Sequence, residues 1–245
     1  VLTVLFEWAG DQMLVVLDGA TGTEELVWED RLAYGSVAVA DTTGDGAPEI
    51  VVTGAGGVQA LTPSGSELWS ASVRGCTGEI RHVSVADLEG DGAAEVLACE
   101  RVLDGATGAE RFAPESRSGS QYVSAISADL DGDGVQEVVA DGNVYDAEGA
   151  VAWSGDVEED YLVWAAPVQV DSDADLEVLF AGTTLAVADS DGTELWSVSL
   201  PDTAYIGAPV LADFDGDGAI ELLLPTLGYL RLFELDGTEV WSAVD

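Results

Sequence analysis

The stretch that decides the fold is Asp129-Leu130-Asp131-Gly132-Asp133-Gly134-Val135-Gln136-Glu137. It follows a short apolar run and places carboxylates at loop positions 1, 3, 5 and 9, with glycine at position 6. Glycine permits a sharp bend, and the carbonyl at position 7 can add an oxygen to those of the carboxylates. Ca²⁺ takes six to eight oxygen ligands in flexible geometry. The stretch therefore predicts a calcium loop between two strands.

The same pattern returns along the chain. An aspartate that closes an apolar run and opens an acidic loop recurs every 42 to 46 residues. An aromatic residue near the end of each unit recurs with nearly the same period, and the tryptophans among these residues are predicted to pack between blades. The aspartates are Asp41, Asp87, Asp129, Asp171 and Asp213, and the aromatic residues are Trp28, Trp69, Phe112, Trp153, Trp196 and Trp241. Two markers with one period indicate a repeat protein.

Each unit is predicted to hold four short strands. In the last unit these are residues 208–212, 221–224, 229–234 and 238–242, with the acidic loop after the first strand. Asp236-Gly237 supplies the hairpin turn before the fourth strand. No segment shows a sustained helical period. Four strands in about 42 residues are typical of propeller blades, so the predicted fold is an all-β propeller.

The number of units predicts six blades in one domain, residues 1–245. The first strand and its acidic loop occur five times, whereas the other three strands occur six times, so residues 1–30 form a blade without its first strand. A fragment of a seven- or eight-bladed propeller is the alternative. The predicted units are 1–31, 32–73, 74–115, 116–156, 157–199 and 200–245.

The predicted metal ligands are the oxygen-bearing positions of the five loops. The loop at Asp171 departs from the pattern, because Leu176-Glu177 follows Asp175 directly, without the glycine and two residues early. Clustered carboxylates repel one another unless a cation neutralises them, so we expect about four calcium sites, with a fifth at Asp171 left open. Solvated Asp-Gly turns are the alternative. The ligands are Asp41, Thr43, Asp45, Ala47 and Glu49; Asp87, Glu89, Asp91, Ala93 and Glu95; Asp129, Asp131, Asp133, Val135 and Glu137; Asp171, Asp173 and Asp175; and Asp213, Asp215, Asp217, Ala219 and Glu221.

The charge of the chain is extreme, with 47 acidic residues against 7 basic ones and a net charge of −40. No basic patch exists to release counterions, so nucleic acid and anionic membranes are excluded as predicted partners. No apolar run is long enough for membrane insertion by a helix. Cations, or a salty exterior that screens self-repulsion, suit this composition better.

The segments 39–52 and 128–134 resemble the FG-GAP (VCBS) repeats of integrin α-subunit propellers and of secreted bacterial proteins. The resemblance covers nearly the whole chain through the five loops. It implies a propeller with structural calcium in loops on one face, and adhesion or ligand binding as the common activity. The turn at Asp18-Gly19 with Trp28 is also similar to quinoprotein dehydrogenase repeats, but the adjacent-cysteine disulfide of those enzymes has no counterpart here.

These features favour a non-enzymatic module, an extracellular or cell-surface propeller for adhesion, recognition or surface assembly. A polysaccharide lyase or glycosidase domain is one alternative, although no catalytic pair stands out. A structural subunit of a filament or surface layer is another, in which a second chain donates the missing strand. The predicted partners are accordingly a protein or glycan ligand, or another copy through strand exchange.

Two further predictions concern aromatic residues and cysteines. Tyr34, Tyr122, Trp164 and Tyr205 each precede a marker aspartate by seven or eight residues. They could form a ligand-binding ring at the mouth of the central channel, or they could pack the seams between blades. Cys76 and Cys99 suit a disulfide in a secreted protein, and two buried free thiols are the alternative.

Overall fold

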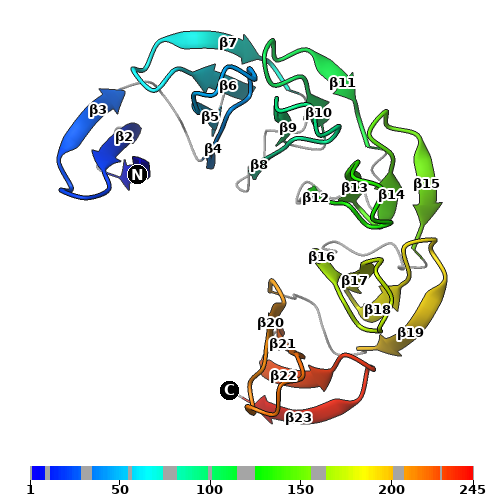
Figure 1. Ribbon diagram of the computed structural model, residues 1–245. Helices are drawn as coiled ribbons and strands as arrows, with labels where there is room; N and C mark the ends of the chain where they lie inside the picture. Colours follow the sequence, from blue (N-terminus) through cyan, green and yellow to red (C-terminus); the bar gives the residue numbers. More distant parts are fainter. Residues whose placement is uncertain are drawn as a thin grey trace. The chain divides into compact units, whose positions relative to one another are not determined.

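The computed structural model describes residues 2–8, 12–28, 35–54, 57–73, 82–98, 101–114, 125–155, 164–200, 207–226 and 228–244. All 23 elements in these ranges are β-strands (Figure 1). The described ranges include no helix that could cross a membrane. The predicted all-β class is confirmed.

The described strands form six antiparallel meanders, and each lies within one predicted unit. The first sheet has three strands, β1 (Leu2–Trp8), β2 (Gln12–Asp18) and β3 (Glu24–Trp28). The next two sheets are β4 (Val37–Ala40), β5 (Glu49–Gly54), β6 (Gly57–Leu61) and β7 (Glu67–Ala71), then β8 (Val83–Ala86), β9 (Glu95–Ala98), β10 (Arg101–Leu103) and β11 (Glu110–Phe112). The fourth sheet is β12 (Ile126–Ala128), β13 (Glu137–Ala140), β14 (Asn143–Tyr145) and β15 (Val151–Ser154). The last two are β16 (Trp164–Val168), β17 (Glu177–Ala181), β18 (Thr184–Ala188) and β19 (Glu194–Ser199), then β20 (Val210–Ala212), β21 (Glu221–Thr226), β22 (Tyr229–Glu234) and β23 (Glu239–Val244).

The three-stranded first sheet confirms the prediction that the first unit lacks one strand. By its internal contacts the chain divides into two compact units, residues 1–114 and 115–245. The first unit holds the first three sheets and the second unit holds the other three. That the whole chain forms one domain stays a prediction.

In the second to the sixth sheet the inner strands are the most buried. β5 and β17 each begin with a glutamate and continue as a mainly apolar run, and they are buried along their whole length. The fourth strand β19 instead alternates between exposed and half-buried residues. A continuous apolar run marks a strand covered on both faces, and alternation marks a strand with one face in water. The burial order thus follows the sequence pattern of each strand.

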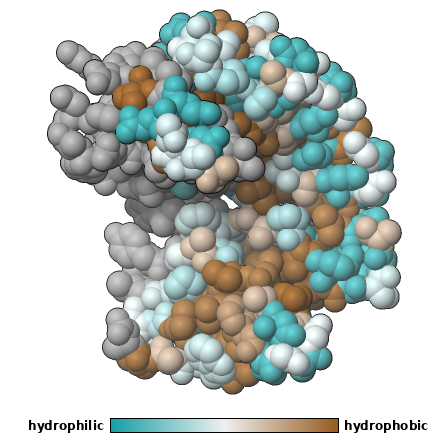
Figure 2. All heavy atoms as spheres, turned by 60° about the vertical axis from the view of Figure 1, so that its left-hand side comes forward, coloured by the Kyte–Doolittle hydropathy of each residue, from teal (hydrophilic) through white to brown (hydrophobic). Residues whose placement is uncertain are grey.

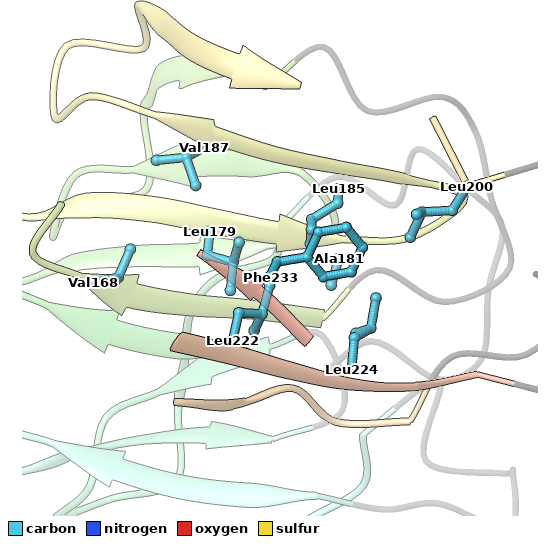
Figure 3. Close-up of a cluster of buried hydrophobic side chains, with 9 residues drawn as sticks. All are labelled: Val168, Leu179, Ala181, Leu185, Val187, Leu200, Leu222, Leu224 and Phe233. Atoms are coloured by element: carbon cyan, nitrogen blue, oxygen red, sulfur yellow. The ribbon is translucent and has the colours of Figure 1, made fainter. Parts of the chain in front are cut away.

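The core lies between neighbouring sheets. One cluster joins Leu179 and Leu185 of the fifth sheet to Leu222 and Phe233 of the sixth (Figure 3). Each of these side chains is fully buried, and burying one contributes about 1.5–3 kcal/mol. Similar clusters join the first sheet to the second, the second to the third, and the fourth to the fifth. Because neighbouring sheets share each cluster, the sheets stabilise one another.

A tryptophan of the fourth strand also fastens one sheet to the next. The indole Nε1 of Trp69 donates a hydrogen bond to the carbonyl of Gly105 at 2.8 Å. Trp153 donates to Ser190 and Trp196 to Leu235, each at 2.7 Å. The predicted packing role of these tryptophans is confirmed.

The sixth sheet leaves its own tryptophan in water. Trp241 is 41% exposed, against 8% for Trp69, and every residue of β23 is exposed. Brown residues gather in the lower part of Figure 2, where the sixth sheet lies. The side chain of Trp28 lies outside the description.

A β-bulge recurs in every described sheet, between the last two strands and next to the hairpin turn. The register shifts by one residue there, for example between Val102 and Leu103, whose partners are Phe112 and Glu110. One residue of the last strand is therefore unpaired in each sheet. These residues are Glu25, Leu68, Arg111, Ala152, Leu195 and Val240. A bulge bends the strand and re-aims this side chain.

Candidate metal centres

The acidic loops are held at both ends by the first two strands of their sheets. In the fourth sheet Ala128 pairs with Glu137, and in the sixth Ala212 pairs with Glu221. The position-9 glutamate thus begins the second strand, and its Oε2 accepts a hydrogen bond from the position-2 amide. The donors are Thr42, Leu88, Leu130, Val170 and Phe214, and the acceptors are Glu49, Glu95, Glu137, Glu177 and Glu221, at 2.6–3.1 Å. This bond is common to all five loops.

That common bond corrects the predicted register of the fifth loop. Glu177 accepts from Val170, and Glu177 pairs with Val168 in the ladder. Val170 therefore stands at position 2 and Gln169 at position 1. The loop runs from Gln169 to Glu177 with the ordinary nine positions, and the prediction that it is two residues short was wrong. The prediction failed because the aspartates of this loop stand at positions 3, 5 and 7, whereas those of a regular loop stand at positions 1, 3 and 5.

Gln169 replaces the first aspartate of the fifth loop with an amide. Its Nε2 donates to the carbonyls of Asp173 and Asp175, at 3.3 and 2.9 Å, and its Oε1 accepts from the amide of Asp171 at 3.1 Å. The side chain therefore holds the loop from within. The predicted ligand Asp175 stands at position 7, and its Oδ2 accepts from the Ser190 hydroxyl at 3.3 Å.

In the other loops the first aspartate accepts backbone amides. Asp213 accepts from Gly216 at 2.6 Å and from Gly218 at 3.0 Å. Gly216 and Gly218 have φ angles of 82° and 95°, in a backbone region that residues other than glycine rarely adopt. The position-7 residues Ala47, Ala93, Val135 and Ala219 each donate to the aspartate two residues earlier. These bonds hold the carboxylates against the backbone of the loop.

Three loops bring carboxylate oxygens to within 4.8 Å of one another, and all three belong to the second unit. Loop 213–221 assembles all four of its predicted acidic ligands. Loop 129–137 assembles three and leaves out Asp133. The groups are Asp213, Asp215, Asp217 and Glu221; Asp129, Asp131 and Glu137; and Asp171, Asp173 and Glu177. Glu177 is a residue that sequence reasoning missed, although a glutamate at position 9 of the other four loops is a signal that could have found it.

Two of these groups hold a buried oxygen with no hydrogen-bond donor among the described residues. These atoms are Oδ1 of Asp129 and Oε1 of Glu177, and the Glu177 side chain is fully buried. Burial, followed by repulsion from Asp171 and Asp173, raises the pKa of Glu177. Burial and then the charge of Asp131 raise the pKa of Glu137. An oxygen of this kind is costly unless a partner reaches it, and a hard cation fits it.

Loop 41–49 satisfies its carboxylates differently. Glu49 accepts from both the amide and the hydroxyl of Thr42, at 2.9 and 3.1 Å. Burial would raise the pKa of Asp41, but the amides of Gly46 and Gly44 outweigh it and lower that pKa. Its predicted ligands Asp41, Asp45 and Glu49 do not form a group as close as those of the second unit. Thr43 contributes a buried hydroxyl with no described partner.

Loop 87–95 pairs its carboxylates with an arginine. Nη1 of Arg111 lies 2.9 Å from Glu89 and 2.9 Å from Glu95, and Nη2 contacts Glu89 as well. The predicted ligands Asp87, Glu89, Asp91 and Glu95 are not assembled as in loop 213–221. In this loop Arg111 already pairs with two of the four predicted carboxylate ligands, Glu89 and Glu95.

A cavity of about 430 Å³ opens beside loop 129–137. Asp131, Glu137, Asp146 and Glu148 line it together with Trp153. Its wall is therefore acidic with one aromatic face, which suits a cationic or hydroxyl-rich ligand.

The remaining predicted residues fall largely outside the described ranges. Tyr34, Tyr122, Tyr205, Cys76 and Cys99 do so, and their predicted roles stay predictions. Trp164 begins β16, is half-buried and packs against the core cluster of the last two sheets. For Trp164 the packing alternative agrees with its position.

Comparisons with known proteins agree with the repeat and the fold. Residues 41–98 match the family described as FG-GAP-like repeat. No curated protein sequence matches the chain.

Solved structures of low sequence identity have the same propeller-type fold. The V. cholerae biofilm matrix protein Bap1 is 21% identical with a TM-score of 0.60, and the match covers 100% of this chain and 55% of that one. BamB from Moraxella catarrhalis is 14% identical with a TM-score of 0.60, covering 100% and 73%. The exotype rhamnogalacturonan lyase YesX is 17% identical with a TM-score of 0.60, covering 97% and 58%. The chain thus spans little more than half the length of Bap1 and of YesX, and these likenesses show the fold alone.

Proposed function

We propose that this chain is a calcium-binding β-propeller module for adhesion, recognition or surface assembly outside the cell. The observation that carries the calcium proposal is the set of three carboxylate groups in the second unit, two of which hold a buried oxygen without a described donor. Oxygen-only donor sets of this kind suit Ca²⁺ better than zinc. The FG-GAP-like match at residues 41–98 supports the same conclusion.

The role of the ion would be structural. Bound calcium would neutralise the carboxylates and fasten the turn between the first two strands of a sheet. In loop 213–221 this would also relieve Glu234, whose pKa is raised by burial and then by Glu221 and Asp217. The backbone amides already orient the aspartates, so the chain prepares the site before an ion arrives.

Recognition outside the cell is supported more broadly. The net charge of −40 suits a calcium-rich exterior, and Bap1, of the same fold, is a biofilm matrix protein. YesX is a lyase, and a carbohydrate-active enzyme domain is the alternative proposal. A binding module remains the function that the described residues support best.

The calcium proposal is tested by thermal unfolding of the full chain in EDTA and in excess calcium. A site filled at a hundred times its Kd adds about 2.7 kcal/mol to the free energy of unfolding, so the melting temperature should rise by several degrees. Magnesium at the same concentration should stabilise less, since it demands stricter geometry.

Matched variants locate the effect. Asp215→Asn should reduce the calcium-dependent rise, whereas Asp236→Asn should preserve it, because Asp236 lies in the hairpin turn of the same sheet and accepts from Thr238. An identical melt of the wild-type protein in EDTA and calcium would exclude structural calcium. Recognition is tested separately, by binding to a glycan array and to bacterial surface polymers with and without EDTA.

A further inference from the structure

Loop 87–95 differs from the other acidic loops because a cation of the chain already lies among its carboxylates. We propose that Arg111 is the resident cation of this loop, and that the loop does not take up calcium. This rests on the proposed function only in treating the other loops as calcium sites. It makes the calcium requirement of the repeats unequal.

The contacts of Arg111 satisfy the carboxylates at positions 3 and 9. Its Nη1 lies 2.9 Å from an oxygen of Glu89 and 2.9 Å from an oxygen of Glu95. Its Nη2 contacts the second oxygen of Glu89. The planar guanidinium thus binds Glu89 through two parallel contacts, a geometry that is stronger than a single ion pair.

Backbone amides donate further hydrogen bonds to the carboxylates of the loop. Oδ1 and Oδ2 of Asp87 accept from Asp91 and Gly92, at 2.9 and 2.8 Å. Oε2 of Glu95 accepts from Leu88 at 3.1 Å. Hydrogen-bond donors therefore reach the carboxylates of loop 87–95. Loops 129–137 and 169–177 instead each leave one buried carboxylate oxygen without a described donor. A divalent ion would have to displace the guanidinium or bind beside it against its charge.

Two departures from the repeat meet in this one sheet. Arg111 is the unpaired residue of the β-bulge, and it is the sole cation among the six bulge residues of the described sheets. Glu89 is the single glutamate at position 3, where the other loops have Thr43, Asp131, Asp171 and Asp215. The bulge aims the arginine toward the loop, and the extra methylene of Glu89 extends the carboxylate toward it. The two residues are complementary. In the described sheets, a glutamate at loop position 3 and an arginine at the bulge occur only together.

Charge effects agree with the geometry. The hydrogen bond from Arg111 is the largest influence on Glu89 and lowers its pKa. The contact with Glu89 in turn raises the pKa of Arg111. Both groups are therefore held in their charged forms.

Calcium stoichiometry of the full chain, measured by equilibrium dialysis, tests the proposal. Arg111→Met should bind one more calcium ion per chain than the wild-type protein, because it frees Glu89 and Glu95 and removes the positive charge from the acidic loop 87–95. The control is Arg101→Met, which removes an arginine of the same sheet that pairs with Glu110 at 3.1 Å, outside the loop. It should leave the number of ions unchanged.

A second pair of variants keeps the test decisive if Arg111→Met does not fold. Glu89→Gln should leave the calcium count unchanged, whereas Asp131→Asn, at the same position of loop 129–137, should lower it by one. An Arg111→Met protein that folds and binds no more calcium than wild type overturns the proposal, as does the loss of one ion in Glu89→Gln. A wild-type protein without any bound calcium would instead overturn the proposed function.

Discussion

Glu89 and Arg111 form an ion pair whose contribution to stability depends on pH. Arg111 lowers the pKa of Glu89 from the ordinary glutamate value of about 4.5. A lowered folded pKa means that the contribution is fully present above the unfolded pKa and is lost as pH falls through the folded pKa. Removing Arg111 should also raise the pKa of the buried Glu95 further, because its neighbouring positive charge disappears. Loss of Arg111 thus raises the pKa of both carboxylates, and both changes lower the stability of the variant near neutral pH.

The measurement is the free energy of unfolding of wild type and Arg111→Met in EDTA, between pH 7 and pH 3. We expect the deficit of the variant to be largest near pH 7 and to shrink as pH falls below about 4.5. Arg101→Met should show a small deficit at every pH, since the Glu110 side chain is 57% exposed and exposed pairs contribute little. A deficit for Arg111→Met that grows toward acid pH would contradict the assigned pairing.

At the scale of the element, the joint between two sheets depends on the hairpin-turn glycine that contacts a tryptophan, as Gly108, Gly192 and Gly237 do. A Cβ added to Gly108 would lie 2.4 Å from the ring of Trp69. The same ring donates its hydrogen bond to Gly105 in that turn. Any side chain at Gly108 would therefore push the tryptophan away and open the seam between the second and third sheets.

Gly108→Ala should destabilise the first unit by about 2–5 kcal/mol, the sum of overpacking and left-handed backbone strain. Gly22→Ala is the matched control, because Gly22 ends an identical five-residue turn with φ of 69° against 72° for Gly108. A Cβ at Gly22 would meet nothing within 4 Å among the described residues, so it should cost only the strain, about 1–2 kcal/mol. If urea denaturation gave equal losses in the free energy of unfolding for the two variants, backbone strain and not the tryptophan contact would account for the destabilisation.

At the scale of the whole molecule, the two compact units differ in how their acidic loops are satisfied. All three close carboxylate groups lie in residues 115–245. In residues 1–114, Thr42 and Arg111 supply donors to the position-9 glutamates. A ligand stabilises only the structure that binds it, so calcium should act unequally along the chain.

Hydrogen exchange measured by mass spectrometry, with calcium and with EDTA, would check this. We expect chelation to increase exchange in the strands that border the three grouped loops, β12, β13, β16, β17, β20 and β21. Exchange in β8 and β9 should change little, since Arg111 remains in place. The Arg111→Met protein is the control, in which β8 and β9 should become calcium-sensitive. An equal change in hydrogen exchange in all of these strands would contradict the expectation that calcium acts unequally along the chain.

The sequence alone determined the repeat, the strands and the positions of four of the five acidic loops. Apolar runs of the right length and Asp-Gly turns are local signals, and their period of about 42 residues identifies the blades. The packing role of Trp69, Trp153 and Trp196 also follows from that period, because each repeat presents the same residue to the next sheet.

Tertiary structure alone decided which loops could receive an ion. The register of loop 169–177 became visible only through the bond from Val170 to Glu177, since counting aspartates aligned Asp171 with the wrong position. The pairing of Arg111 with Glu89 joins residues 22 positions apart, and no local pattern marks it. Charges interact through space, so their partners depend on how the strands are paired and not on their distance along the chain.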